Sequence, residues 1–136
     1  QYARQIGAMF RDRPHVLEDL LDGLFYIAKA DGVFHPNEEN YLRSVAGIFG
    51  FSENDWLRIK AGHVGPDAGD PYVILGVSRA VSDIELKTAY RTLVSANHPD
   101  RLIAQGMPEE FINVANNKVA TINDAYDRIA KQRGIT

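Results

Sequence analysis

Cysteine is absent from the 136 residues, so the chain has neither a disulfide framework nor a thiolate metal site. This absence fits a reducing compartment, and we expect the cytoplasm. No apolar run approaches the roughly 18 consecutive residues of a membrane-spanning helix, and no signal-peptide pattern opens the chain. The first residue is glutamine, which suggests a fragment or a processed chain. A fragment could have lost a membrane anchor from its front, and the sequence leaves that question open.

The sequence also lacks an excess of positive charge, and its formal net charge is −3. Residues 1–69 contain seven Lys or Arg against ten Asp or Glu, and residues 70–136 contain eight of each kind. A surface that binds nucleic acid needs a basic cluster, often alternating with aromatic residues, and neither half has one. We therefore do not expect nucleic acid as a partner.

Apolar residues recur at helical spacing through residues 1–62, and no alternating strand pattern interrupts them. The spacing predicts helices over 1–11, 15–30, 36 to about 49, and from the N-cap Ser52 to 59 or 61. Gly32 is expected to end the second helix, and Trp56 to anchor the fourth. Residues 1–62 are therefore predicted to form a small helical bundle.

Glycine and proline are concentrated between residues 62 and 71, where the periodicity lapses. We predict a linker at 63–69 and a second domain at 70–136. This domain is expected to have a short helix over 72–75, a helix over 83–96 that begins at a capping box of Ser82 and Glu85, and a helix over 109–131. Two apolar stripes should join the long helices: Leu86, Ala89, Tyr90 and Leu93 on one, and Phe111, Ala115, Val119, Ile122, Tyr126 and Ile129 on the other. The predicted fold class is all-α.

Between the two long helices stands the tripeptide His98-Pro99-Asp100. Proline fixes its own φ and keeps the preceding residue out of the helical region, so a stiff loop is expected at the tip of a helical hairpin. Asn, Pro and Asp are also ordinary turn formers, and the tripeptide alone is therefore a weak signal. A stiff exposed loop nevertheless presents its side chains to a partner.

Three basic residues adjoin this loop. Lys87 and Arg91 are four residues apart and share one helix face, and Arg101 extends that face toward the tip. Such a face is either a solvated surface or a docking surface. The residues alone leave both interpretations open.

The tripeptide becomes a specific signal when it is taken together with three flanking motifs. The four occur in this order: YVILGV at 72–77, LKTAYRTL at 86–93, the tripeptide, and INDAY at 122–126. This arrangement resembles the J domain of DnaJ-type co-chaperones and covers about residues 70–134. The resemblance implies a protein that stimulates ATP hydrolysis by a DnaK-type chaperone and needs no cofactor. It implies partner-binding roles for the following residues: His98, Pro99, Asp100, Lys87, Tyr90, Arg91 and Arg101.

In that family the basic helix face docks on an acidic surface of the partner ATPase. The resemblance implies that Asp100 pairs with an arginine of the partner, while Pro99 shapes the loop and His98 supports its contacts. The sequence departs from the family pattern at Thr88, Thr92 and Ala96, which are uncharged, and at Asn97, which stands where an aromatic residue is common. We therefore expect weaker electrostatic steering than is usual.

The N-terminal half carries AKADG at 28–32, followed by Glu38 and Glu39, and resembles the TerB-like domain. A TerB-like domain followed by a J domain is the layout of the DjlA family, bacterial DnaJ-like proteins with an N-terminal membrane anchor. Residues 101–110 and 126–134 also look like the DjlA version. The resemblance implies that the full-length protein works at the cytoplasmic face of the bacterial inner membrane.

The sequence offers three alternatives to a co-chaperone. The first is an enzyme in which His98 and Asp100 serve as a general acid and base. No nucleophile or oxyanion hole is recognisable in the sequence beside them, so we do not expect an enzyme. Four residues suggest a calcium site: Asp31, Asn37, Glu38 and Glu39. Their spacing is not that of an EF-hand, and helix boundaries explain them without metal. The third alternative is a stress-response sensor or scaffold that acts through the TerB-like domain, with the hairpin as an appendage.

Overall fold

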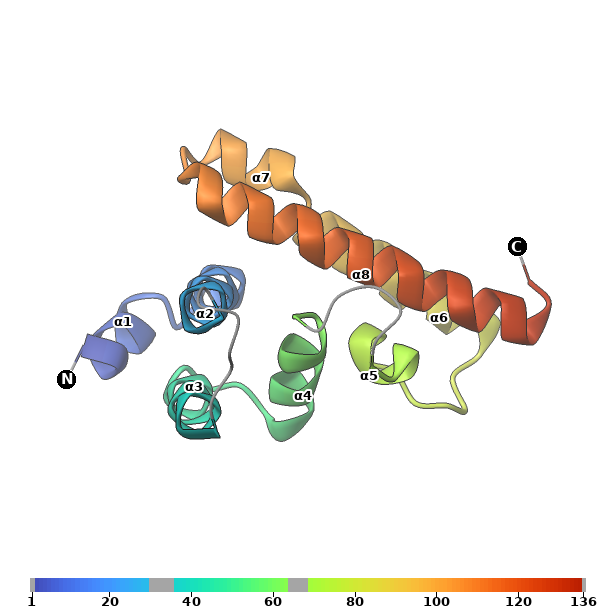
Figure 1. Ribbon diagram of the computed structural model, residues 1–136, viewed down its shortest axis with the longest axis horizontal. Coiled ribbons are helices and arrows are strands. Elements are labelled where there is room, and N and C mark those ends of the chain that lie inside the picture. The colour runs from blue at the N-terminus through green and yellow to red at the C-terminus, as the bar shows by residue number, and fades with distance from the viewer. Residues whose placement is uncertain (1, 30–35, 64–68, 136) are drawn as a thin grey trace. The chain divides into compact units, whose positions relative to one another are not determined.

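The computed structural model describes residues 2–29, 36–63 and 69–135, and all regular secondary structure in these ranges is helical (Figure 1). The predicted all-α class is therefore confirmed. The chain divides into two compact units, residues 1–56 and residues 57–136. Within the described ranges, no helix combines the length and the apolar character needed to cross a bilayer.

The first unit contains α1 (Tyr2–Met9), α2 (Pro14–Ala28), α3 (Pro36–Ile48) and the start of α4 (Glu53–Ala61). Pro14 and Pro36 lie in first turns, where the missing N–H has no helical partner to lose. The Ser52 hydroxyl accepts a hydrogen bond from the Asp55 N–H at 3.1 Å, so the predicted N-cap of α4 is confirmed. The helix stop expected at Gly32 lies outside the described residues.

The core of the first unit is formed mainly by α2 and α3. Phe25 of α2 stacks on Trp56 with 5.6 Å between the ring centroids, which confirms Trp56 as the anchor of α4. Gly7 is buried on α1, and a Cβ there would lie 3.3 Å from the Ile48 carbonyl oxygen. Close approach of α1 to α3 therefore depends on this glycine. The other buried apolar residues of these helices are Leu17, Leu21, Leu42, Val45 and Ala46.

The second unit is organised around α8 (Glu109–Arg133), 25 residues long and thus ~37 Å from end to end. The other helices of this part are α5 (Pro71–Leu75), α6 (Asp83–Ala96) and α7 (Pro99–Ala104), and all three pack against α8 (Figure 1). The bounds of α6 agree with those expected from the sequence. The Ser82 hydroxyl caps it by accepting from the Glu85 N–H at 3.1 Å.

The core of the second unit joins α5, α6 and α8. Its buried members are Tyr72, Ile74, Leu75, Leu86, Ile122, Ala125 and Ile129, with Tyr90, Leu93 and Tyr126 packed at the edge. The two predicted stripes do face each other. Helix α8 also buries Val114, Lys118, Thr121 and Ala130, which were not predicted.

Two guanidinium groups lie over the aromatic ring of Tyr72 in α5. The guanidinium carbon of Arg79 lies 5.1 Å from the Tyr72 ring centroid, and that of Arg133 lies 5.7 Å from it. Arg79 pairs with Asp70 at 2.7 Å, and Arg133 pairs with Asp83 at 2.8 Å. Cation–π contacts and ion pairs together fix the loop that joins α5 to α6.

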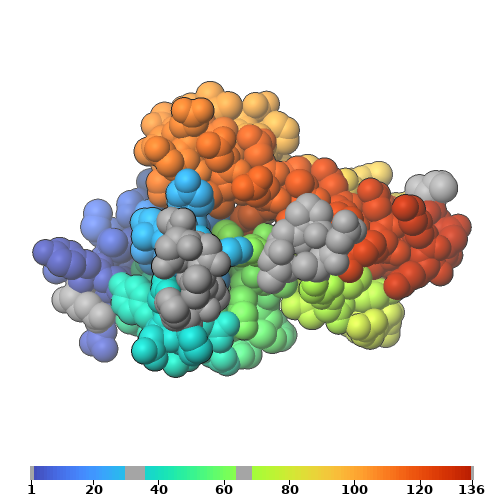
Figure 2. Space-filling view, viewed as in Figure 1, coloured from blue at the N-terminus to red at the C-terminus, as the bar shows by residue number. Residues whose placement is uncertain are grey.

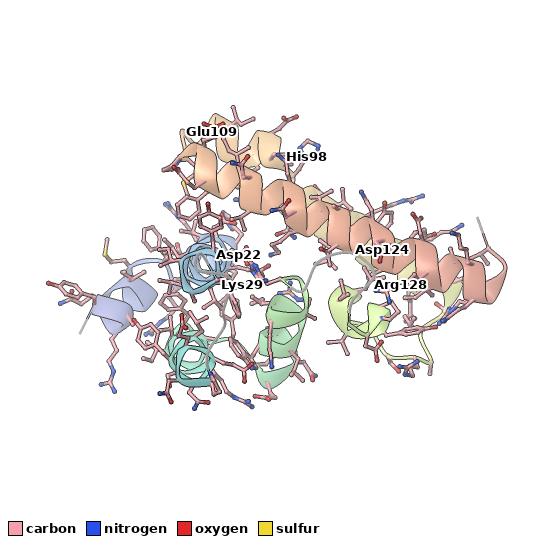
Figure 3. The ribbon with its side chains drawn as sticks, in the orientation of Figure 1. Asp22, Lys29, His98, Glu109, Asp124 and Arg128 are labelled. Carbon is pink, nitrogen blue, oxygen red and sulfur yellow. The ribbon has the colours of Figure 1, made fainter. Side chains whose placement is uncertain are left out.

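Two further contacts fix the approach to α5. On α8, Arg128 pairs with Asp124 at 3.0 Å, and its Nη1 donates to the Gly69 carbonyl at 3.1 Å (Figure 3). The contact therefore holds the residue just before the Asp70 N-cap against α8.

The division between the units falls inside α4, between Trp56 and Leu57. Ala61 packs against the core of the second unit. Gly76 has a positive φ of 69°, and a Cβ placed on it would lie 2.8 Å from Cδ of Arg58. The end of α4 therefore packs with the second unit. The domain boundaries expected from the sequence, with a linker at 63–69, stay a prediction, since residues 64–68 lie outside the described residues.

Candidate partner-binding site

The turn out of α6 is made by Asn97. Its backbone N–H and its Nδ2 both reach the Leu93 carbonyl oxygen, at 3.0 and 2.8 Å, and its side chain is buried. His98 then has extended backbone, with φ −65° and ψ 132°, as a residue before proline should. The expectation that His98 cannot continue the first helix is confirmed.

The tripeptide is the beginning of α7, whereas the sequence predicted a loop. His98 is the N-cap, and its Nδ1 accepts a hydrogen bond from the Asp100 N–H at 3.1 Å. Pro99 occupies the first helical position, where its fixed φ suits a helix. Asp100 lies in the first turn, where a negative charge is favourable beside the helix dipole. The three residues therefore form an ordered first turn.

The functional side chains of this turn face solvent. The Asp100 side chain is 83% exposed and that of His98 is 49% exposed, with 3.7 Å between Nδ1 and Oδ2. Figure 3 shows the His98 side chain at the start of α7, and Figure 2 shows this part of the chain at the molecular surface, in orange. Asp100 thus offers an accessible carboxylate on a fixed backbone.

An open groove of about 370 Å³ lies beside this turn, along α6. It is lined by Tyr90, Arg91, Val94, Ser95 and His98. Three of the predicted partner-binding residues therefore share one surface depression. Val94 and Ser95 were not predicted, although their spacing of three and four residues from Arg91 places them on its helix face.

The other two predicted basic residues, Lys87 and Arg101, are not among the residues that line this groove. Lys87 is half-buried, one helical turn before Arg91. Arg101 is also half-buried, and its Nε donates to the Ala96 carbonyl oxygen at 2.9 Å. This hydrogen bond ties α7 to the last turn of α6, so Arg101 has a structural contact that the sequence did not reveal.

Tyr90 joins the groove to the core. Its hydroxyl donates to Oδ1 of Asn123 at 2.6 Å, and its ring stacks on Tyr126 with 4.2 Å between centroids. Burial raises the pKa of the Tyr90 hydroxyl, and the negative charge of Asp127 raises it further. The hydroxyl is therefore a neutral donor at physiological pH, and its hydrogen bond ties this wall of the groove to α8.

Helix α7 itself is the feature that the sequence analysis missed. Its signals were a proline at the first position, the apolar Leu102 and a glycine after the last turn. Leu102 is buried, and Gly106 adopts a positive φ of 70°. At six residues, the helix is too short for apolar periodicity to distinguish it from a loop.

Groups of three or more potential metal ligands do not occur among the residues that the structure describes. Asp31, the first residue of the calcium alternative, lies outside them. Glu38 and Glu39 are half-buried in the first turn of α3, where they complement the helix dipole.

Family models match both halves of the chain. Residues 1–61 match the family of tellurite resistance protein TerB, and residues 70–133 match the DnaJ domain. The chain is therefore a J-domain protein in which a TerB domain precedes the DnaJ domain. The expected order of the two domains is thus confirmed.

Curated relatives narrow this class. The chain is 44% identical over 66 residues to co-chaperone protein DjlA of Shewanella oneidensis, which is 48% of this chain and 25% of the relative. It is 48% identical over 66 residues to DjlA of Vibrio cholerae, covering 48% of this chain and 23% of that protein. DjlA of Pasteurella multocida is 44% identical over 70 residues, which cover 52% of this chain and 24% of that protein.

These matches span about a quarter of each relative's length. No solved structure matches the chain. The chain therefore matches the TerB and DnaJ families in that order, and over about half of its length it is similar to proteins named co-chaperone protein DjlA.

Proposed function

We propose that this protein is a J-domain co-chaperone that stimulates ATP hydrolysis by a DnaK-type chaperone through His98, Pro99 and Asp100. One observation carries the proposal. The accessible carboxylate of Asp100 stands on the first turn of α7, beside a groove that contains Tyr90 and Arg91. The name of the relatives, co-chaperone protein DjlA, supports the same function.

The three residues of the turn have different proposed roles. Asp100 forms an ion pair with an arginine of the partner ATPase. Pro99 holds the backbone in the first helical position, and His98 caps the turn so that the Asp100 backbone does not move. Preorganisation of this kind lowers the conformational entropy lost on binding, because the backbone that carries the Asp100 carboxylate is already held in place.

The basic face next to the groove is proposed to guide association. Arg91 is exposed and Lys87 is half-buried, and both lie on α6 on the side that leads to His98. Charges at the rim of an interface mainly change the association rate and its salt dependence. Arg101 is proposed to contribute less to this guidance than Lys87 and Arg91, because its Nε already donates a hydrogen bond to the Ala96 carbonyl oxygen.

The proposed role is to act on a partner enzyme, and the chain itself is not proposed to catalyse a reaction. His98 and Asp100 lie on an exposed turn, which does not exclude water from a reacting group. The proposal places the protein in the cytoplasm, or at the cytoplasmic face of the inner membrane as part of a longer chain.

The direct test is single-turnover ATP hydrolysis by a purified bacterial DnaK, with and without this chain. We expect the hydrolysis rate to increase with the concentration of the chain and to saturate. A chain that is folded by circular dichroism but leaves the rate unchanged would refute the co-chaperone proposal. The sensor or scaffold alternative predicts that second result.

A further inference from the structure

Helix α7 is a fixed extension of the turn that carries Asp100. Leu102 is only 3% exposed, and α7 packs against α8. The Met107 N–H donates to the Leu102 carbonyl at 3.0 Å and closes the C-terminal end. His98 caps the N-terminal end, and Arg101 ties the helix to Ala96. These contacts fix the backbone of α7, so the other residues of the helix start from defined backbone positions relative to Asp100.

One large apolar side chain on this helix faces solvent. Ile103 is 56% exposed and follows Asp100 by three residues, so the two side chains lie on neighbouring positions of one helix face. A single exposed isoleucine is ordinary on a protein surface. Ile103 differs because it stands one turn from the carboxylate through which the proposed function operates.

An exposed ion pair contributes little to binding, because water and salt screen it. Asp100 is 83% exposed in the free chain, so its pairing with a partner requires that water be excluded on complex formation. Apolar contacts around a central polar contact perform this exclusion in protein interfaces. Ile103 lies where such a contact is needed.

We infer that Ile103 is a second contact for the same DnaK-type ATPase, an inference that rests on the proposed function. Ile103 docks on an apolar surface next to the partner's arginine. The docking surface then has three adjoining parts: the groove along α6, the Asp100 carboxylate, and the exposed face of α7. The occupant is the same partner, since Ile103 and Asp100 belong to one rigid helix.

The test is the same single-turnover assay, run as a titration with Ile103→Ser. Burial of the exposed part of an isoleucine corresponds to roughly a four- to twentyfold change in affinity. We expect the half-maximal concentration to rise by that factor, while the maximal rate stays unchanged. We also expect the stimulation that remains to be more sensitive to salt than that of the wild type.

Ile84→Ser provides a matched control. Ile84 is even more exposed, at 79%, and lies at the opposite end of α6 from His98. It should leave the titration unchanged. Ile103→Val keeps most of the apolar area and should behave almost as the wild type, and thermal melts check that each variant is folded.

Two results would overturn the inference, and they can be told apart. If the wild type stimulates DnaK and Asp100→Asn does not, but Ile103→Ser remains within twofold of the wild type, the apolar contact is refuted and the co-chaperone function stands. If the folded wild type does not stimulate DnaK, both proposals are refuted together.

Discussion

Nδ1 of His98 accepts a hydrogen bond from the backbone N–H of Asp100 at 3.1 Å. This relationship gives the imidazole a structural role at the start of α7, because a helix N-cap needs an acceptor and Nδ1 must be unprotonated to supply one. Asp100 is therefore oriented through its backbone, and its carboxylate remains accessible to a partner. The two residues act at different steps: one positions the turn and the other makes the external contact.

Two substitutions of His98 distinguish its role as the N-cap of α7 from a contact of its imidazole ring with the partner. Asparagine is a good N-cap residue and glutamine is not, so His98→Asn should preserve α7 while His98→Gln should destabilise it by about 1 kcal/mol. Both variants should lose chaperone stimulation if the ring also contacts the partner. Hydrogen exchange at the amides of residues 100–104 reports the cap. Equal protection in the two variants would contradict the capping role.

Asp100→Asn should abolish chaperone stimulation without unfolding the chain. The backbone N–H that His98 binds is unchanged, and loss of the dipole contact costs only about 0.3–1 kcal/mol. Removing one member of a desolvated interfacial ion pair costs roughly 2–5 kcal/mol, on the order of thirtyfold to several-thousandfold in affinity. Single-turnover hydrolysis measures the loss, with circular dichroism as the folding control. Full stimulation by the folded variant would remove the carboxylate from the mechanism.

Charge reversal of Lys87 and Arg91 together should slow association with DnaK and leave the hairpin folded. Neither residue belongs to the core cluster of the second unit. The effect should be greatest at low ionic strength, since the Debye length falls from about 30 Å at 0.01 M to about 8 Å at 0.15 M salt. Association rates from surface plasmon resonance at several salt concentrations provide the measurement. Lys131→Glu, on the exposed surface of α8, is the control and should have little effect.

Tyr90→Phe should lower the free energy of unfolding by about 1 kcal/mol at pH 7, through loss of the hydrogen bond to Asn123. The raised pKa of the Tyr90 hydroxyl adds a pH dependence. The folded state holds this proton more tightly than the unfolded chain, so the contribution is complete below about pH 10 and is lost as the pH rises through the folded pKa. Urea denaturation at pH 7 and pH 10.5 tests both parts.

The control for this experiment is Tyr41→Phe, since Tyr41 is an exposed residue of α3. It should change stability little at either pH. If the free energy of unfolding of Tyr90→Phe falls between pH 7 and pH 10.5 as steeply as that of the wild type, the Tyr90 hydroxyl does not hold its proton more tightly in the folded state.

Gly76→Ala and Gly106→Ala form a matched pair for the contact between Arg58 and Gly76, which both belong to the second unit. Both glycines have φ near 70°, so each alanine introduces strain of roughly 1–2 kcal/mol. Only at Gly76 would the new Cβ meet a neighbour, Arg58, whereas none lies within 4 Å at Gly106. Chemical denaturation should show the larger destabilisation for Gly76→Ala. Equal effects would indicate that Arg58 moves aside at no cost.

The sequence was most informative where local chemistry determines local structure. Ser52 and Ser82 marked the starts of α4 and α6, and the apolar spacing around Leu86 and Ile122 identified the facing stripes of the hairpin. The motifs around His98 predicted the DnaJ domain that the family model matches, because several short patterns in a fixed order are far more specific than any one of them.

The features that were missed depend on tertiary contacts. Lys118 is 3% exposed although lysine is usually a surface residue, and its Cε lies 3.6 Å from the position of a Cβ on Gly62. Asn97 is buried because it turns back onto the Leu93 carbonyl. Helix α7 is stabilised by its cap and by α8 more than by propensity, since an isolated helix of its length is unstable in water.

The packing of Ala61 and Arg58 with the second unit bears on how this DnaJ domain should be transplanted into another protein. A graft that begins at residue 70, where the family match starts, would leave behind one apolar neighbour of the core and the side chain that rests against Gly76. The portable module is therefore longer than the homologous segment. A chimaera that carries residues 57–136 should retain the melting temperature of the parent unit, and one that carries residues 70–136 should melt lower.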